Sequence, residues 1–342
     1  MIRQSHCAEI GSEFWDVPQV ETCHEMFPKA TQWYLSGRSA LMAILAELEG
    51  CRTVAMPSWC CDSMIKPFAD AGLEVRFYRI DWKSGLTREL CTDCDILFLM
   101  EYFGYSGTPF ERNGYRGVVI RDVTHSLFSG TYSDADYYFG SLRKWCGIWT
   151  GGYAWRADGR AMRSVVTADD GGYTALRKKA MQLKHAYING VDALGADKSY
   201  LGVFSEAEDI LEDIGILAAA ERDVEAALHL DVAYIKKRRR ANAEILRKAF
   251  HDWLIFPEMA ATDCPMFVPV LVPEGKRDAL RRNLIEHQIY CPIHWPVSNY
   301  HSVDVKNDMI YANELSLVCD QRYTEEDMNR MVDTIRTFWK EG

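Results

Sequence analysis

This sequence of 342 residues has no apolar run of about 18 residues, the length that a membrane-spanning helix requires. Its first segment, MIRQSHCAEIGSEFW, also lacks the apolar core of an export signal. Neither internal repeats nor low-complexity linkers interrupt the chain. We therefore expect a cytoplasmic protein that has no membrane partner.

An excess of positive charge is also absent. Lys and Arg number 39 against 49 Asp and Glu, which gives a net charge of −10 with His neutral. A surface with this charge repels nucleic-acid phosphates and anionic lipids, so neither is expected as a partner. The run KKRRR at 236–240 lies in an apparent helix, where a solvated or subunit-facing basic face is favoured and nucleic-acid contact is the alternative.

The eleven cysteines do not form the short, paired framework of a disulfide-stabilised domain. They are odd in number and scattered, which favours reduced thiols in the cytosol. Cys91 and Cys94 form a CxxC motif, but no second pair or histidine follows at the spacing of a zinc site. No metal site is therefore expected.

Short apolar runs recur from residue 53 onward and alternate with helical patterns. The expected strands are 53–56 (TVAM), 74–80 (EVRFYRI), 95–100 (DILFLM), 117–122 (GVVIRD) and 135–140 (ADYYFG). Runs that are apolar at successive positions suit strands covered on both faces. The pattern predicts an α/β fold, with a mostly parallel central sheet flanked by helices, of which the first two lie at 38–48 and 60–71.

After about residue 172 the sequence changes to long, charged helical patterns. A strand is expected at 266–273, a helix at 276–288 and a last helix at 324–339, with Thr324 as its N-cap. We therefore expect a large α/β domain with an N-terminal arm over residues 1–230. A smaller α+β domain is expected over residues 231–342.

Ligands in open α/β sheets bind beyond the carboxyl ends of the strands, so polar residues at those positions are candidates for a site. The segment Ser36, Gly37, Arg38 and Ser39 precedes the first helix. Unpaired N–H groups, a glycine, a cation and a hydroxyl together suit an anion such as a phosphate. An ordinary Ser/Gly helix cap is the alternative.

Three further polar residues follow expected strands. Asp122 ends the run GVVIRD, and His125 comes three residues later. Lys144 follows the run ADYYFG, three residues after Ser141 and among apolar neighbours. Such neighbours predict a desolvated lysine, whose neutral amine suits Schiff-base chemistry, although a solvated surface charge is the alternative.

A helix N-terminus for a phosphate, a lysine amine and a carboxylate for a ring nitrogen are together the parts of a pyridoxal 5′-phosphate (PLP) site. The combination is more specific than any of its members. It predicts that Asp122 keeps a proton on the pyridine nitrogen, and that Lys144 moves a proton during the reaction.

Most of the chain resembles the DegT/DnrJ/EryC1/StrS family of fold type I PLP-dependent aminotransferases. The resemblance rests on SGRSAL (36–41), VAMPSWCCDSMIKPFADAGLEVRFYRID (54–81), VIRDVTHS (119–126), GSLRKWCGIWTGGY (140–153), IKKRRRANAEIL (235–246), IYCPIHWP (289–296) and LSLVCDQRYTEEDMNRMVDTI (315–335). It implies the type I fold and PLP as the cofactor. It also implies a homodimer, because a neighbouring chain normally completes sites of this fold.

The resemblance implies a role for each candidate residue. Lys144 is the Schiff-base lysine, Asp122 binds the pyridine nitrogen, and His125 contacts the 3′ oxygen of the cofactor. The phosphate group is held by Gly37, Arg38, Ser39 and Ser141.

The sequence departs from the family pattern at several of these positions. Arg38 replaces the usual threonine of the phosphate loop, and Cys61 stands where an aromatic residue stacks on the ring. Trp59 is expected to stack instead, with a packed core tryptophan as the alternative. Tyr102 and His294 are candidates for substrate contacts, with satisfied buried polar residues as the alternative.

The resemblance implies a ping-pong aminotransferase that moves an amino group from an amino acid such as glutamate to a keto sugar, which is nucleotide-linked in most of the family. Its partners are therefore small molecules. The alternatives are another PLP-dependent reaction, such as that of a lyase or dehydratase, and a non-catalytic regulatory protein that keeps the fold. The sugar dehydratases of the family have histidine in place of the lysine, so Lys144 favours transamination.

Overall fold

The computed structural model of the chain describes residues 9–23, 25–81, 87–90, 92–107, 110–130, 134–163, 165, 167–190, 197–302, 305 and 308–341. Contacts between Cα atoms divide the chain into two compact units. The first unit comprises Met1–Ser12, Cys51–Asp134 and Val232–Gly342, and the second comprises Glu13–Gly50 and Ala135–Asp231. One boundary between the units lies next to the predicted domain boundary at residues 230 and 231, which remains a prediction.

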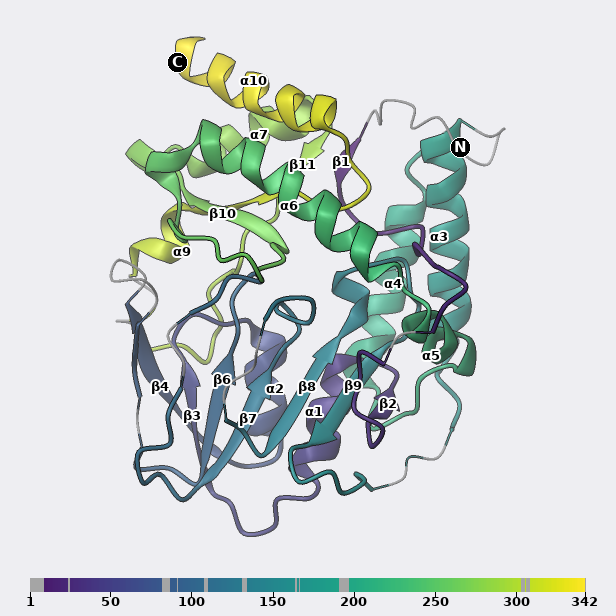
Figure 1. The fold of residues 1–342 in the computed structure, drawn as a ribbon, viewed down its shortest axis with the longest axis vertical. Helices are drawn as coiled ribbons and strands as arrows, with labels where there is room; N and C mark the ends of the chain where they lie inside the picture. Colours follow the sequence, from purple (N-terminus) through teal and green to yellow (C-terminus); the bar gives the residue numbers. More distant parts are fainter. Residues whose placement is uncertain are drawn as a thin grey trace. The chain divides into compact units, whose positions relative to one another are not determined.

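A mostly parallel sheet forms the centre of the first unit (Figure 1). Its strands are β3 (Thr53–Pro57), β4 (Glu74–Asp81), β5 (Thr87–Glu89), β6 (Ile96–Met100) and β7 (Val118–Asp122). They lie in the order β7-β6-β3-β4-β5, and only β5 runs antiparallel to its neighbour. All residues of β6 are buried, as a strand covered on both faces requires. Helix α2 (Asp62–Asp70) packs against β4.

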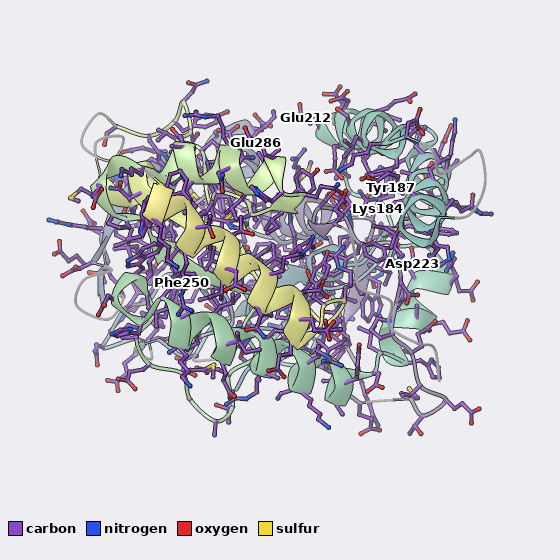
Figure 2. All side chains as sticks on the ribbon, turned by 90° about the horizontal axis from the view of Figure 1, so that it is seen from above. Lys184, Tyr187, Glu212, Asp223, Phe250 and Glu286 are labelled. Atoms are coloured by element: carbon purple, nitrogen blue, oxygen red, sulfur yellow. The ribbon has the colours of Figure 1, made fainter. Side chains whose placement is uncertain are left out.

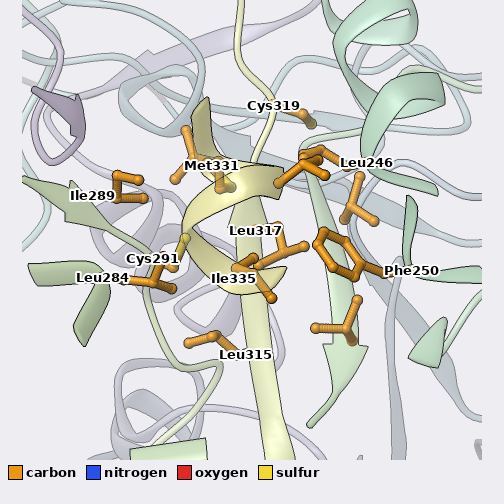
Figure 3. Packing of buried hydrophobic residues seen from close by; sticks show 14 of the residues in the cluster. Leu246, Phe250, Leu284, Ile289, Cys291, Leu315, Leu317, Cys319, Met331 and Ile335 are labelled. Carbon is orange, nitrogen blue, oxygen red and sulfur yellow. The ribbon is translucent and has the colours of Figure 1, made fainter. Parts of the chain in front are cut away.

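The C-terminal part of the first unit surrounds an apolar core. Its elements are α6 (Val232–Ala249), the 3-10 turn His251–Trp253, β10 (Phe267–Leu271), the 3-10 turn Pro273–Gly275, α7 (Arg277–Glu286), β11 (Ile289–Tyr290), α9 (Met309–Asn313), β12 (Glu314–Val318) and α10 (Glu325–Glu341). Strands β10 and β12 are antiparallel, and β11 pairs with the short β1 (Ile10–Gly11). Figure 3 shows side chains of α6, α7, α10 and β12 meeting in this core, among them Leu246, Leu284, Leu317 and Ile335.

Helix α10 begins as its sequence predicts. Thr324 Oγ1 accepts a hydrogen bond from the Asp327 N–H at 3.4 Å, and the Thr324 N–H donates to Asp327 Oδ2 at 2.9 Å. This reciprocal cap satisfies donors of the first turn. The acidic residues Glu325, Glu326 and Asp327 in that turn also suit the positive end of the helix dipole.

The basic run of α6 is solvated only in part. Its Lys237 is exposed, whereas two of its arginines bond within the first unit. Arg239 is 1% exposed and donates to Gln321 Oε1 at 2.8 Å and to the Met266 carbonyl at 2.9 Å. Arg240 donates to the carbonyls of Ala260 and Asp263. These guanidinium groups hold α6 to neighbouring loops of the same unit.

The second unit contains an antiparallel sheet and several helices. Its strands are β2 (Gln32–Tyr34), β8 (Tyr137–Ser141) and β9 (Gly152–Arg156), with β9 between the other two. The helices are α1 (Gly37–Leu45), α3 (Tyr173–Asn189), α4 (Tyr200–Asp213) and α5 (Glu221–Leu228), together with the 3-10 turn η1 (Leu142–Lys144). Helices α3 and α4 pack against each other (Figure 1). Asp223 in the first turn of α5 (Figure 2) accepts hydrogen bonds from the N–H and hydroxyl of Thr150.

Within the described part of the chain, no helix is long and apolar enough to span a membrane. The same residues contain no group of three or more His, Cys, Asp or Glu side chains arranged to hold a metal ion. Cys94 Sγ lies 3.6 Å from the Tyr115 hydroxyl, whereas Cys91, the other half of the CxxC motif, lies outside the described residues.

Candidate functional site

In the second unit, the N-terminus of α1 lies close to strands β8 and β9. Ser36 is the N-cap, and its Oγ accepts a hydrogen bond from the Ser39 N–H at 3.1 Å, so the predicted helix cap is present. A Cβ at Gly37 would lie 3.2 Å from Ser141 Cβ, and a Cβ at Gly152 would overlap the Ser36 carbonyl oxygen. Glycine at both positions therefore lets the first turn of α1 lie against β8 and β9.

Two predicted phosphate ligands are already engaged within the second unit. Ser39 is 1% exposed, and its hydroxyl donates to the Gly215 carbonyl at 2.8 Å. Arg38 donates through one terminal nitrogen to the Leu211 carbonyl at 3.1 Å. Its Nε atom is buried and has no hydrogen-bond partner among the residues that the structure describes. Arg38 therefore retains a donor for an anion, whereas the contacts of Ser39 suit a structural role.

Lys144 ends η1, for which Ser141 is the N-cap. The expectation of a desolvated lysine is wrong for this structure, because Lys144 is exposed while Leu142 and Trp145 are fully buried. Residues three apart share a face of a 3-10 turn, so burial of Leu142 and Trp145 directs Lys144 to the other side. Its apolar sequence neighbours therefore fill the core without covering the amine.

Further charged residues of the second unit lie around Lys144. Burial acts to raise the pKa of Glu13, but the cations Arg177, Arg143, Lys144 and Lys184 outweigh it, and the pKa lies below its usual range. Arg177 bonds to Glu13 at 3.3 Å and to Glu208 at 3.4 Å. This cluster was not predicted from the sequence.

A signal for this cluster is present in the sequence of α3. The buried face of that helix comprises Tyr173, Arg177, Ala180, Met181 and Lys184, which recur at helical spacing. Both Arg177 and Lys184 are almost fully buried. Figure 2 labels Lys184 and Tyr187 on this helix. A cation within an apolar stripe indicates a buried polar contact, since long cationic side chains are rarely buried without a partner.

In the first unit, Asp122 ends β7 and is 3% exposed. Its Oδ1 accepts a hydrogen bond from the Thr124 N–H at 2.8 Å, which fixes the carboxylate in the turn after the strand. His125 follows in that turn and is 4% exposed. Its Nδ1 accepts from the Phe103 N–H at 3.4 Å, so a neutral His125 carries its proton on Nε2.

Trp59 and Tyr102 lie in an aromatic cluster of the first unit. Their rings stack at a centroid distance of 4.9 Å, and both residues are at most 2% exposed. The Tyr102 hydroxyl donates to the Trp59 carbonyl at 2.7 Å. These contacts favour the alternatives for both residues, a packed core tryptophan and a satisfied buried tyrosine.

His294 joins the same cluster. Its carbonyl accepts a hydrogen bond from Trp59 Nε1 at 2.8 Å, and its ring centroid lies 6.0 Å from that of His125. Phe103 and Trp295 fill the space around both imidazoles, with Trp295 stacked on His125 at 5.7 Å. The first unit thus brings His125, Trp59, Tyr102 and His294 together.

The predicted site residues fall into two groups, which the structure describes separately. The second unit carries Gly37, Arg38, Ser39, Ser141 and Lys144, and the first unit carries Trp59, Tyr102, Asp122, His125 and His294. Among them, Gly37 and Ser141 approach each other directly, and Asp122 and His125 share one turn.

No family model matches the chain, and no curated protein matches it. Several solved structures, in contrast, match the fold of this chain. A DegT DnrJ EryC1 StrS aminotransferase from Brucella abortus superposes with a TM-score of 0.59 at 15% identity, over 90% of this chain and 85% of that one. DesI, solved in the presence of its TDP-sugar product, gives a TM-score of 0.61 at 15% identity, over 90% and 80%. The sugar aminotransferase CalS13 from Micromonospora echinospora gives 0.56 at 17% identity, over 90% and 87%. The chain therefore has the fold of the DegT/DnrJ/EryC1/StrS aminotransferases, which confirms the fold class predicted from its sequence.

Proposed function

We propose that this chain is a PLP-dependent aminotransferase that transfers an amino group from an amino acid, with glutamate as the expected donor, to a keto sugar. The observation that carries the proposal is the arrangement in the second unit, where Lys144 leaves a strand end at which Ser141 meets the first turn of α1. The shared fold supports it. A Streptococcus pneumoniae protein of the same fold was solved in PLP and PMP forms.

The residues of the second unit fit the phosphate of PLP. The first turn of α1 has N–H groups at the positive end of the helix dipole, where a dianion is stabilised. A side chain at Gly37 would crowd Ser141, so the glycine keeps this approach open. Arg38 adds a positive charge and a buried Nε donor. We assign the phosphate to Gly37, Arg38 and Ser141, with Ser39 supporting the turn.

The residues of the first unit fit the ring of PLP. Asp122 offers a buried carboxylate held in place by the Thr124 N–H, which suits a protonated ring nitrogen. His125 presents an Nε2–H donor, because its Nδ1 accepts a backbone hydrogen bond, and a donor suits the ring oxygen. The resemblance assigns these residues and Lys144 to the same cofactor.

When bound, PLP supplies an electron-accepting ring that stabilises negative charge on a substrate carbon. Asp122 holds the proton of the ring nitrogen, which keeps the ring electron-poor. With PLP bound, Lys144 Nζ would be the base that takes a proton from the substrate carbon. Exposure of Lys144 keeps the amine accessible to incoming molecules.

Borohydride reduction of the PLP-loaded protein, followed by peptide mapping, tests this assignment. The pyridoxyl group should be found on the peptide that contains Lys144. Lys144→Ala should remove the label, whereas Lys179→Ala, which changes an exposed lysine of α3, should leave it in place. A label on another residue, or a chain that takes up no PLP, would contradict the proposal.

We further propose that the chain acts as a homodimer and that its acceptor is nucleotide-linked. DesI supports a nucleotide-linked acceptor, since it was solved in the presence of its TDP-sugar product. The resemblance supports a homodimer, because a neighbouring subunit normally completes sites of this fold.

A further inference from the structure

Three polar groups of the first unit form a continuous hydrogen-bonded chain. Ser316 Oγ lies 2.6 Å from Glu314 Oε1 and 2.8 Å from His294 Nδ1. Glu314 Oε2 accepts the His294 N–H at 2.6 Å. Glu314 and Ser316 are fully buried, and they occupy alternate positions on β12, so both side chains leave the same face of that strand.

Which group donates each of these hydrogen bonds depends on whether Glu314 is protonated. An ionised carboxylate only accepts hydrogen bonds, so the Ser316 hydroxyl donates to it and its oxygen accepts from His294 Nδ1–H. A protonated Glu314 carries its proton on Oε1, because Oε2 faces the His294 N–H. The Ser316 hydroxyl then donates to Nδ1, and the proton of a neutral His294 lies on Nε2.

We propose that Glu314 and Ser316 are positioning residues that set which ring nitrogen of His294 carries its proton. They thereby set whether His294 Nε2 accepts or donates a hydrogen bond. This inference rests on the proposed function only in assigning His294 to the sugar acceptor. Sugar hydroxyls both donate and accept, so the state of Glu314 selects which hydroxyl geometry His294 binds.

The surroundings of Glu314 favour such a switch. Burial raises the pKa of Glu314 to about 8, although the Ser316 hydroxyl, the His294 N–H and Arg277 act to lower it. Cys291 stays a neutral thiol, because burial raises its pKa to about 12. The ring of His125 lies 6.0 Å from that of His294. Burial therefore keeps the proton on Glu314 up to about pH 8.

Long-range ¹⁵N NMR of histidine-labelled protein distinguishes the two neutral tautomers directly. The His294 signal is identified by its loss in His294→Asn. In the wild-type chain, the His294 proton should move from Nε2 to Nδ1 as the pH rises from about 7 to about 10.

Two variants separate the roles of Glu314 and Ser316. In Glu314→Gln, the amide oxygen accepts the His294 N–H and the amide NH₂ donates to Ser316, so His294 should stay in the Nε2–H tautomer at every pH. In Ser316→Ala, the position of the His294 ring proton should no longer depend on whether Glu314 is protonated. One tautomer throughout the wild-type titration would overturn the proposal, and this holds even if either variant fails to fold.

Kinetics provide the second readout. Glu314→Gln should change KM for the acceptor by about 5-fold or more and kcat less, because the variant alters how a substrate hydroxyl is held. Equal effects on both constants would contradict a positioning role. The NMR test needs no PLP, so its failure leaves the aminotransferase proposal standing, and failure to bind PLP leaves the tautomer result valid.

Discussion

At the scale of single residues, burial and neighbouring charges together decide how the pKa of a carboxyl group changes. Glu314 is fully buried in the first unit, and burial favours its neutral form although the nearby cation Arg277 acts in the opposite direction. The pKa of Glu13 is lowered instead, because four cations surround this carboxylate. The two carboxylates show that neighbouring charge can outweigh burial.

The Glu314 carboxyl should make folding stability depend on pH. An unfolded glutamate releases its proton near pH 4.5, whereas Glu314 in the folded chain keeps it up to about pH 8. The free energy of unfolding should therefore be highest below pH 4.5 from this source and fall as the pH rises to about 8. Urea unfolding across this range measures the slope.

Glu314→Gln removes this titration, so the stability of the variant relative to the wild type should rise from about 1 kcal/mol at pH 5 to about 4 kcal/mol at pH 8. Glu286→Gln, which changes an exposed glutamate of α7 (Figure 2), is the matched control and should follow the wild-type curve. Parallel curves for the wild type and Glu314→Gln would show that Glu314 titrates normally.

Residue types predicted much of the candidate site, but not the contacts between its members. Asp122, His125 and Lys144 were identified because each follows an apolar strand pattern. The chain from Glu314 through Ser316 to His294 was not, because ELSLV reads as an apolar strand and its partner lies 20 residues earlier in the sequence. Only tertiary structure brings such residues together.

At the scale of elements, the first turn of α1 depends on a glycine. Gly37→Ala should weaken PLP binding by about 10-fold or more, because the added Cβ would lie 3.2 Å from Ser141 Cβ and shift the turn. Stability should change by about 1 kcal/mol or less, since alanine also favours the helix. Fluorescence titration with PLP and urea unfolding measure the two effects.

Gly202→Ala is the control for this change. Gly202 lies exposed within α4, and a Cβ there meets nothing within 4 Å. The variant should bind PLP as the wild type does and be slightly more stable. Equal PLP affinity in Gly37→Ala and the wild type would remove the first turn of α1 from the binding site.

The elements themselves were predicted well where a pattern was regular. The apolar runs beginning at residues 53, 74, 95 and 117 became β3, β4, β6 and β7, each within one or two residues of its expected bounds. The long charged pattern after residue 200 was harder to divide. It forms α4, α5 and α6, and no proline separates them to reveal the breaks.

At the scale of the whole molecule, the proposal includes a homodimer. Light scattering after size exclusion should give twice the mass of one chain for the PLP-loaded protein. Dilution that separates the subunits should also release PLP if a neighbouring chain completes the site. A monomer that keeps PLP at every concentration would contradict the dimer and leave the cofactor assignment intact.

Fold and function also differ in how far the sequence predicts them. The fold follows from apolar patterning over most of the chain, and solved structures at 14–17% identity share it. The acceptor depends on a few side chains, such as His294 and its neighbours, whose contacts come from distant segments. Pattern alone therefore cannot name the sugar.

The central claim, amino transfer through PLP, is tested most directly by a single turnover with glutamate alone. The PLP-loaded wild type should convert its cofactor to PMP and release 2-oxoglutarate in equal amount, both measured by chromatography of the quenched mixture. Lys144→Ala should yield neither product. If the wild type holds PLP but forms no PMP with glutamate or with any other amino acid, the chain is not an aminotransferase.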